Sequence, residues 1–448
     1  MTSNNNKVEL QRVLAWVGNP PAHWKIDRLK WSVAGLFNGV WGEEPNGEED
    51  IICVRVADFD RTRFTVVDTP PTIRAVQVKE RTNRTLRRGD LLIEKSGGGD
   101  NQPVGCVVHF DHAFDAVCSN FVGRMPVATG MHPRYWSYVH ASLYAGRINI
   151  PAIKQTTGIQ NLDADVYLNN LVPFPPFEEQ CKIADYLDRE TARIDGLIAA
   201  KERVLSLMAE KRRALITRAV TCGLDPKAPL CDSGIPWLGK IPKHWEVWKL
   251  AHLADIGNGS TPSRENVGYW SDGSIPWLNS SVVNQDEVIE SDQFITKLAL
   301  KECHLPMVQP GSVLVGITGQ GKTRGQAVVL SFESTINQHL AFVAPDPSKM
   351  DSWFLRWIFS AAYDYIRAIS DDAGGTKGAL TCEELADMKV FVPPFAEQHA
   401  IVAHVAAETG KLDAMRMATE KTIGLLKERR SALITAAVTG RIDLSNKK

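Results

Sequence analysis

The chain has 448 residues, of which 44% are hydrophobic and 23% charged, so it can bury more than one hydrophobic core. Its formal net charge of −1 excludes a whole-chain attraction to nucleic acid or to an acidic surface, and any nucleic-acid site must be local. No apolar run approaches the roughly 20 residues of a membrane helix, and the polar start has no signal-peptide core. We therefore expect a cytoplasmic protein of two or more domains.

The cysteines and histidines predict no metal site. The eight cysteines form no C-x-x-C pair and none lies at metal-ligand spacing from a histidine, so we expect reduced, structural thiols. The closest histidine pair, His109 and His112, is spaced i, i+3 in an expected strand or turn, and we interpret it as an ordinary pair.

The first large segment, residues 25–172, follows a short block that reads "WVGNPPAHWKIDRL" from Trp16. It carries short β-rich runs such as "IICVRVADF" and "DLLIEKS", separated by glycine, proline and asparagine. One helical stretch, "PRYWSYVHASLYAGRI", begins at Pro133. The pattern predicts an independent α+β domain, which we call head 1.

A long proline-free segment follows head 1. After Pro175 and Pro176 come about 40 residues rich in Ala, Leu, Glu, Lys and Arg, which predict a helix of roughly 60 Å. Apolar residues recur along it at heptad distances, as is typical of a helix that packs on another helix. The members of this stripe are Leu187, Ile194, Met208 and Leu215.

The chain then repeats itself. Residues 393–443 match residues 175–225 at a constant offset of 218, and a block from Trp237 that reads "WLGKIPKHWEVWKL" matches the block from Trp16. Between them, residues 246–390 carry β-rich runs and a helical stretch, which predict a second α+β domain, head 2. The repeated helix has an equivalent stripe: Val405, Leu412, Leu426 and Leu433.

These patterns predict an α+β fold in which two α/β heads are separated by two long antiparallel helices. The helices form a coiled-coil-like spacer, and the chain has a pseudo-two-fold internal repeat. The alternative is two separate helices, each buried against its own head. The predicted segments are head 1 with its block at 1–172, a helical region at 173–225, head 2 with its block (234–250) at 226–390, and a second helical region at 391–448.

Two diverged heads on a nearly identical scaffold suit two similar targets at a fixed separation, such as DNA half-sites about 34 Å apart. Contacts to bases and phosphates need basic, amide and hydroxyl side chains on loops or helices. Head 1 offers Arg81, Arg84, Arg87, Arg88, Lys95, Ser96, Asn101, Lys154, Gln155, Gln160 and Asn161. Head 2 offers Asn279, Ser280, Thr318, Lys322, Arg324 and Lys377.

Residues 316–323, "GITGQGKT", satisfy the phosphate-binding pattern G-x-x-x-x-G-K-[ST]. A phosphate-binding loop must be followed by a helix, yet "RGQAVVLSF" alternates like a returning strand. The corresponding stretch of head 1 has Glu94 and Asp100 in place of the first glycine and the lysine. We therefore interpret the stretch as a flexible hairpin, with Lys322 and Arg324 as candidates for holding a DNA phosphate or base edge.

The order of the parts resembles the specificity subunit of type I restriction-modification systems across essentially the whole chain. The motifs that carry the resemblance are "PPFEEQ" and "PPFAEQ" at the helix starts, and "RRALITRAVTCGLDP" and "RRSALITAAVTGRIDL" at their ends. The resemblance implies two target-recognition domains, each reading one half of a bipartite DNA sequence. It also implies helices that set the spacer and dock two methyltransferase subunits.

The same resemblance implies that catalysis belongs to partners. Adenine N6 methylation with S-adenosylmethionine would belong to the methyltransferase subunits, and cleavage and translocation with ATP and Mg²⁺ to restriction subunits. No Asn or Asp precedes either Pro-Pro-Phe, so the chain lacks the [ND]-P-P-[FY] motif of an adenine methyltransferase. The helical residues assigned to the scaffold and docking surface are the two apolar stripes with Glu179, Gln180, Glu397 and Gln398.

Two other functions stay open at this point. One is a P-loop nucleotidase or motor, for which the only support is the pattern at residues 316–323. The other is a two-headed adaptor that binds proteins or RNA. Turnover of ATP by the chain alone would favour the first, and failure to recognise any DNA sequence together with a methyltransferase partner would favour the second.

Overall fold

The computed structural model describes residues 15–99, 101–156, 158–235, 237–319, 321–372 and 379–442. The chain forms two compact units of mixed α and β structure: unit 1 consists of Met1–Glu202 with Lys421–Lys448, and unit 2 of Arg203–Glu420. Each unit therefore contains one head, the start of one long helix and the end of the other. The described part of the chain has no helix long and apolar enough to cross a membrane.

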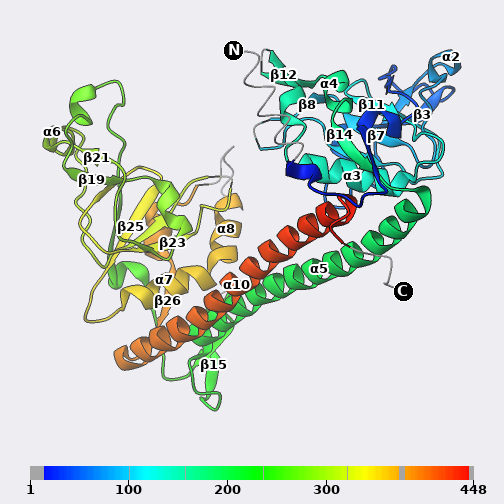
Figure 1. The fold of residues 1–448 in the computed structure, drawn as a ribbon. Coiled ribbons are helices and arrows are strands. Elements are labelled where there is room, and N and C mark those ends of the chain that lie inside the picture. The colour runs from blue at the N-terminus through cyan, green and yellow to red at the C-terminus, as the bar shows by residue number, and fades with distance from the viewer. Residues whose placement is uncertain are drawn as a thin grey trace. The chain divides into compact units, whose positions relative to one another are not determined.

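Head 1 is built on a six-stranded sheet of order β2-β11-β7-β9-β5-β4 and a three-stranded sheet of order β10-β3-β6. A second three-stranded sheet, β12-β13-β8, and the pair β1-β14 complete it (Figure 1). The strands are β1 Lys25–Arg28, β2 Phe37–Asn38, β3 Asp50–Val54, β4 Phe59–Asp60, β5 Thr65–Val66, β6 Ile73–Ala75, β7 Leu91–Glu94, β8 Ser96–Gly97, β9 Val107–His109, β10 Ala116–Cys118, β11 Val122–Met125, β12 Ile153–Thr156, β13 Ile159–Leu162 and β14 Leu171–Phe174. The helices are α2 Val78–Arg81, α3 Pro133–Ala145 and α4 Ala164–Leu168, with short 3₁₀ turns at Leu29–Ser32, Val56–Asp58 and Ile150–Ala152.

Head 2 is built on a five-stranded sheet of order β18-β25-β22-β23-β20 and a three-stranded sheet of order β21-β19-β24, with the pairs β15-β16 and β17-β26. The strands are β15 Leu230–Asp232, β16 Lys240–Pro242, β17 Glu246–Lys249, β18 Ala254–Asn258, β19 Ile275–Leu278, β20 Glu287–Val288, β21 Phe294–Ile295, β22 Val313–Gly316, β23 Ala327–Leu330, β24 Thr335–Ile336, β25 Leu340–Pro345 and β26 Lys389–Val392. The helices are α6 Lys297–Glu302, α7 Ser352–Ala361, α8 Tyr363–Asp372 and α9 Cys382–Asp387, with 3₁₀ turns at Leu250–His252, Val267–Tyr269 and Ser280–Asn284.

The two heads share one topology. The order β2-β11-β7-β9-β5 in head 1 corresponds strand by strand to β18-β25-β22-β23-β20 in head 2, and β10-β3-β6 corresponds to β24-β19-β21. In both three-stranded sheets the central strand has one parallel and one antiparallel neighbour. One helix packs on the equivalent strand of each large sheet, α3 on β9 and α7 on β23. The predicted second copy of the α+β head is therefore present, although the sequences of the heads have diverged.

The two long helices are α5 Phe177–Cys222, with 46 residues, and α10 Phe395–Val438, with 44 residues (Figure 1). Each starts directly after a Pro-Pro pair, as predicted, because proline is tolerated at a helix start and not within one. At 1.5 Å per residue each is about 65–70 Å long. Within unit 1 the start of α5 and the end of α10 belong to one hydrophobic core, and within unit 2 the end of α5 and the start of α10 belong to another.

The predicted heptad stripes are buried in their first half and drift off the buried face later. Leu187 and Val405 are fully buried, but Leu215 and Leu433 are only partly buried, and the next residues, Ile216 and Ile434, are buried instead. A straight helix drifts about 20° per heptad, so four heptads bring the following residue onto the original face. Ile194 and Leu412 are buried, and Met208 and Leu426 lie between buried and exposed.

Candidate nucleic-acid-recognition site

The Gly-rich stretch of head 2 is a β-hairpin. Strand β22 returns as the antiparallel strand β23, with Val313 opposite Val329, and the Gly316 N–H donates to the Gln326 carbonyl at 2.9 Å. A Cβ added at Gly316 would lie 2.4 Å from the Thr323 carbonyl oxygen, so the close approach of the returning turn before β23 requires a glycine here. The stretch is followed by a strand, as predicted, and it lacks the helix that a phosphate-binding loop requires.

The corresponding region of head 1 brings four polar side chains together in two pairs. The Lys95 ammonium donates to Asn38 Oδ1 at 2.5 Å, and the Ser96 hydroxyl donates to Asn161 Oδ1 at 2.6 Å. Burial lowers the pKa of Lys95. Three of these residues were predicted as DNA contacts from the sequence: Lys95 follows β7, Ser96 begins β8, and Asn161 lies opposite Ser96 in β13.

Several other candidates of head 1 are held by contacts within the protein. Arg81 Nε donates to the Val76 carbonyl at 2.8 Å, and Arg84 donates to the Glu80 carbonyl at 3.1 Å. Gln160 is buried, with its Oε1 accepting from the Val104 N–H at 3.2 Å. These three side chains position the backbone of head 1.

The remaining candidates of head 1 lie at its surface. Arg88 forms an ion pair with Asp111, and Lys154 forms one with Asp163 at 2.6 Å, but both basic side chains remain about three-quarters exposed. The candidates with exposed side chains and no such ion pair among the described residues are Arg87, Asn101 and Gln155.

In head 2 one candidate needs correction. Arg324 is only 2% exposed, so the interpretation of Arg324 as a residue that reaches DNA from a free hairpin is wrong. The reason is tertiary: α8 packs against the returning turn, and the Tyr363 hydroxyl donates to the Lys322 carbonyl at 2.9 Å. The Lys322 side chain itself is exposed.

The other candidates of head 2 have defined places. The Thr318 hydroxyl and His339 Nδ1 lie 2.7 Å apart in a hydrogen bond. Asn279 caps a short 3₁₀ turn, because its Oδ1 accepts from the Ser281 N–H at 2.8 Å. Ser280 is partly exposed. Lys377 lies outside the described residues.

Sequence reasoning missed the exposed side chains next to these residues. In head 1 they are Asn120 and Phe121, and in head 2 they are Gln338 and His339. The signal was available, because "FDAVCSNFV" aligns with "FESTINQHL" in the repeat at an offset of 218. Phe121 was missed because the candidates were chosen from clusters of basic, amide and hydroxyl residues.

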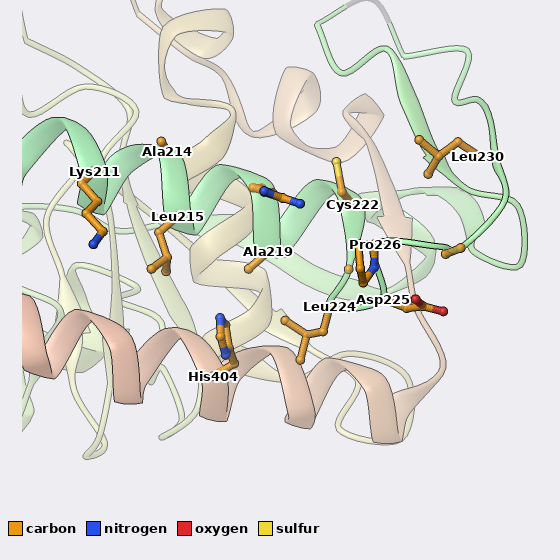
Figure 2. A pocket seen from close by; sticks show the side chains of 13 residues that line it. Lys211, Ala214, Leu215, Ala219, Cys222, Leu224, Asp225, Pro226, Leu230 and His404 are labelled. Atoms are coloured by element: carbon orange, nitrogen blue, oxygen red, sulfur yellow. The ribbon is translucent and has the colours of Figure 1, made fainter.

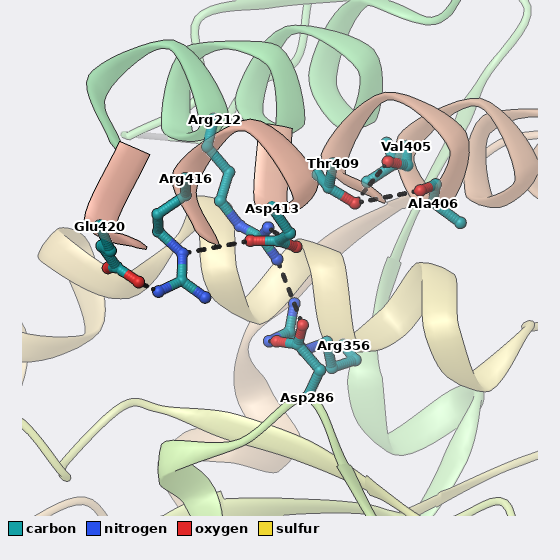
Figure 3. A network of polar contacts seen from close by, with 9 residues as sticks. All are labelled: Arg212, Asp286, Arg356, Val405, Ala406, Thr409, Asp413, Arg416 and Glu420. Atoms are coloured by element: carbon teal, nitrogen blue, oxygen red, sulfur yellow. Dashed lines mark hydrogen bonds and ion pairs between the residues drawn. The ribbon is translucent and has the colours of Figure 1, made fainter. Parts of the chain in front are cut away.

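An arginine joins the helices to the head in unit 2 (Figure 3). Arg212 of α5 reaches Asp413 of α10 at 2.6 Å and Asp286 of head 2 at 3.2 Å. Asp286 also pairs with Arg356 of α7, whose guanidinium is buried and lies 3.9 Å from the centre of the Trp357 ring. The four charges therefore tie both long helices to the core of the head.

Unit 1 has the equivalent arginine with a different partner in the head. Arg430 of α10 pairs with Asp195 of α5 at 2.9 Å, and each of these residues is 218 positions from its counterpart in unit 2. On the head side, the Arg430 guanidinium lies 5.7 Å from the centre of the Phe64 ring. The helix–helix ion pair is thus common to both units, while the contact to the head is ionic in one and cation–π in the other.

Changing Asp286 to Asn is expected to lower the free energy of unfolding by about 1–3 kcal/mol, because the buried guanidinium of Arg356 loses its carboxylate. Half of the Asp286 side chain is exposed, so water compensates in part. Chemical denaturation measures the effect, and Asp292→Asn, at an exposed position of the same head, is the control. Equal stability of the two variants would contradict this role for Asp286.

The predicted scaffold residues at the helix starts contact their own head. Gln180 is buried, accepts from the His132 N–H at 3.0 Å and donates to the Pro175 carbonyl at 2.9 Å. Its counterpart Gln398 accepts from the Asp351 N–H at 2.8 Å. The donating N–H in each case belongs to the residue that caps α3 or α7, so the two glutamines join each long helix to the main helix of its head.

The adjacent glutamates make a second equivalent pair of contacts. Glu179 and His23 lie 2.7 Å apart, and Glu397 and His244 lie 2.8 Å apart. The histidines come from the repeated blocks, so these contacts explain why each block accompanies its helix in the sequence.

A groove in unit 2 runs beside the end of α5 (Figure 2). It has a volume of about 750 Å³, and its lining combines apolar side chains with charged and titratable ones: Leu215, Ala219, Leu224, Lys211, Arg218, Asp225 and His404. Leu215 is one of the predicted docking residues. Leu230 of β15 also lines the groove and is 49% exposed.

In the described part of the chain, no three His, Cys, Asp or Glu side chains are grouped so that they could hold a metal ion. All eight cysteines are free, as expected. Each head exposes side chains that can bind a polar ligand: Asn120 and Phe121 in head 1, and Gln338 and His339 in head 2.

Comparison with known proteins agrees with this description. The fold defines a protein with two mixed α/β heads carried on long helices, and residues 242–409 match the family model of the type I restriction modification DNA specificity domain. The EcoKI specificity subunit of Escherichia coli K12 is 23% identical over 449 residues, covering 95% of this chain and 90% of the relative. The MjaIX specificity subunit of Methanocaldococcus jannaschii is 30% identical over 169 residues, or 37% of this chain and 38% of the relative.

Among solved structures, a chain from a study of complex assembly in the type I R-M system has a TM-score of 0.66 at 19% identity, covering 95% of this chain and 100% of that one. This likeness establishes the fold. Over most of its length the chain is therefore similar to a type I restriction enzyme specificity subunit, and residues 242–409 match the DNA specificity domain of such enzymes.

Proposed function

We propose that the chain is the DNA specificity subunit of a type I restriction-modification complex, in which each head recognises one half of a bipartite target. The observation that carries the proposal is the pair of heads with one strand order and different exposed side chains at equivalent places. A common scaffold keeps the two heads in the same relation to the DNA strand, and the divergent side chains select different bases.

In this proposal, α5 and α10 set the spacer between the half-sites. The equivalent ion pairs Arg212–Asp413 and Arg430–Asp195 support an antiparallel, coiled-coil-like pair with pseudo-two-fold symmetry. Half-sites at a fixed separation can be read from one side of the duplex by such a protein.

The chemistry belongs to partners in this proposal. Methyltransferase subunits carry out adenine N6 methylation with S-adenosylmethionine, and restriction subunits cleave and translocate DNA with ATP and Mg²⁺. This chain supplies recognition and docking and is not itself catalytic. We therefore expect no ATP turnover by the purified chain, and turnover that Lys322→Ala abolishes would overturn the proposal.

We assign the groove beside the end of α5 to the docking of a methyltransferase subunit. Its lining is mainly apolar and carries two basic side chains, Lys211 and Arg218, against one carboxylate, Asp225, so it suits an apolar segment that also has acidic residues. The groove contains Leu215, and the exposed Leu224 and Leu230 extend its apolar surface.

Changing Leu230 to Asp is expected to weaken binding of the methyltransferase subunit by about tenfold or more, because a carboxylate in the groove must be desolvated on docking. Calorimetry with the purified subunit measures the affinity. The control is Val267→Asp, which places the same charge at a 67% exposed position of head 2 away from the groove. Unchanged affinity for the Leu230 variant would remove the groove from the docking surface.

The direct test of recognition is binding to a library of random duplexes by the chain together with its methyltransferase subunits. We expect enrichment of one sequence with two defined parts and an undefined spacer of constant length. Enrichment of no DNA sequence would favour a protein or RNA adaptor.

A further inference from the structure

The turn that follows the parallel edge strand of each three-stranded sheet has the same backbone in both heads. In head 1 this turn is residues 119–121, after β10, and in head 2 it is residues 337–339, after β24. The N–H of the first turn residue donates to the carbonyl of Val54 in head 1 and of Leu278 in head 2, at 2.9 Å in each case. Both acceptors end the central strand of the sheet.

The other end of the turn is held in the same way. The carbonyl of Phe121 accepts from the Lys95 N–H at 2.8 Å, and the carbonyl of His339 accepts from the Ile317 N–H at 3.0 Å. Lys95 and Ile317 follow the equivalent strands β7 and β22, where the Gly-rich stretches begin. The two turns therefore have one backbone frame, fixed at both ends to the sheets.

The side chains on this frame differ in chemistry. In head 1 the exposed residues are Asn120 and Phe121, and the Phe121 ring, 48% exposed, borders a pocket of about 420 Å³. Trp41, 38% exposed, lines the same pocket, and Glu94 lies at its buried end. The Glu94 carboxylate is 2.8 Å from Arg61, and burial raises its pKa despite this partner.

In head 2 the frame presents hydrogen-bonding groups. Gln338 and His339 are both exposed. The Gln338 Oε1 accepts from the Thr261 hydroxyl at 2.5 Å, which orients the amide, and His339 Nδ1 is paired with the Thr318 hydroxyl at 2.7 Å. Gln338 Nε2 lies 3.4 Å from His339 Nε2, so one of its two N–H groups is left as a donor, and the amide oxygen keeps a second lone pair as an acceptor.

We infer that this turn is the base-reading site of each head, with a nucleobase edge in the major groove as its ligand. The inference rests on the proposed function. The backbone of the turn is the same in the two heads, whereas its side chains differ. Two heads of one fold could select different bases in this way. Phe121, with Trp41 beside it, offers the apolar contact that recognises the methyl group of thymine, and Gln338 offers the paired donor and acceptor that recognise adenine.

The test exchanges the turn residues between heads and determines the methylated sequence with the complete complex. The double variant Asn120→Gln with Phe121→His is expected to change the preferred base at one or two positions of a single half-site, by about tenfold in preference. The other half-site and the spacer stay as they are. The control Ile73→Ala removes another exposed apolar side chain of head 1, 48% exposed and outside the pocket, and leaves the sequence unchanged.

The outcomes separate this inference from the proposed function. A wild-type complex without sequence preference would contradict the proposed function itself. A wild-type complex with a bipartite target, together with an exchange variant that keeps the same target and preference, would overturn the base-reading role of the turn. Should the double variant fail to fold, Phe121→Leu, which keeps an apolar contact, must retain the thymine preference and Phe121→Gln must lose it, and equal preferences of these two variants would overturn the inference.

Discussion

Replacing residues 25–172 with the corresponding head of a relative is expected to change one half of the DNA target completely and to leave the other half unaltered. The replaced segment includes the large sheet of head 1 and the turn at residues 119–121 that we propose reads bases, whereas head 2 belongs to a separate compact unit. Each wrong base costs roughly 1–3 kcal/mol, so a half-site of several changed positions loses binding almost entirely. Sequencing of the methylated sites in cells that carry the chimaeric complex measures the result.

The head exchange must keep the contacts that join head 1 to its helices. On the helix side these are Gln180, which accepts from the N–H of the residue that caps α3, and Arg430, whose guanidinium lies 5.7 Å from the centre of the Phe64 ring. The chimaera should therefore keep an aromatic residue at position 64, where it contacts Arg430. A second chimaera with Phe64→Ala shows the effect of losing this contact. Changes in both half-sites of a folded chimaera would show that the heads do not read DNA independently.

Changing Gln398 to Ala is expected to lower the free energy of unfolding by about 2–4 kcal/mol. The buried amide accepts from the Asp351 N–H and donates to the Lys349 and Pro393 carbonyls, so its removal leaves buried backbone groups without a partner. Hydrogen exchange should accelerate first in α7, whose capping residue is Asp351.

The repeat supplies a matched experiment for this prediction. Gln180→Ala should accelerate exchange in α3 of head 1 and leave α7 unchanged, because Gln180 accepts from the residue that caps α3. Gln285→Ala, at an exposed position, is the surface control. Similar exchange in α3 and α7 for all three variants would contradict the role of the two glutamines as joints between helix and head.

The features of the fold that could be predicted from the sequence are those set by local pattern and by the repeat. Pro-Pro followed by a long proline-free segment predicted α5 and α10, and alternation predicted that β23 returns after the Gly-rich stretch. The buried face of the helices was harder, because heptad counting selects Leu215 where the 3.6-residue period buries Ile216.

The contacts of the candidate site residues were less predictable than the fold. The sequence shows which side chains are charged, but it does not show which side chain each one pairs with. Arg88 and Asp111 are 23 residues apart in sequence yet form an ion pair, and Arg324 is buried because α8 packs on its turn. Arg212 was not recognised as a joint, since its partners Asp286 and Asp413 are 74 and 201 residues away. Antiparallel packing of the helices determines such pairs, and only the three-dimensional arrangement reveals them.

We propose that the two heads, which share one fold, read two different half-sites at a fixed spacing. The most direct test is to sequence the methylated adenines in DNA from cells that carry the whole system. We expect a single bipartite sequence with two specific parts separated by a spacer of constant length and any composition. Methylation at one continuous sequence, or at two parts with a variable spacer, would contradict it.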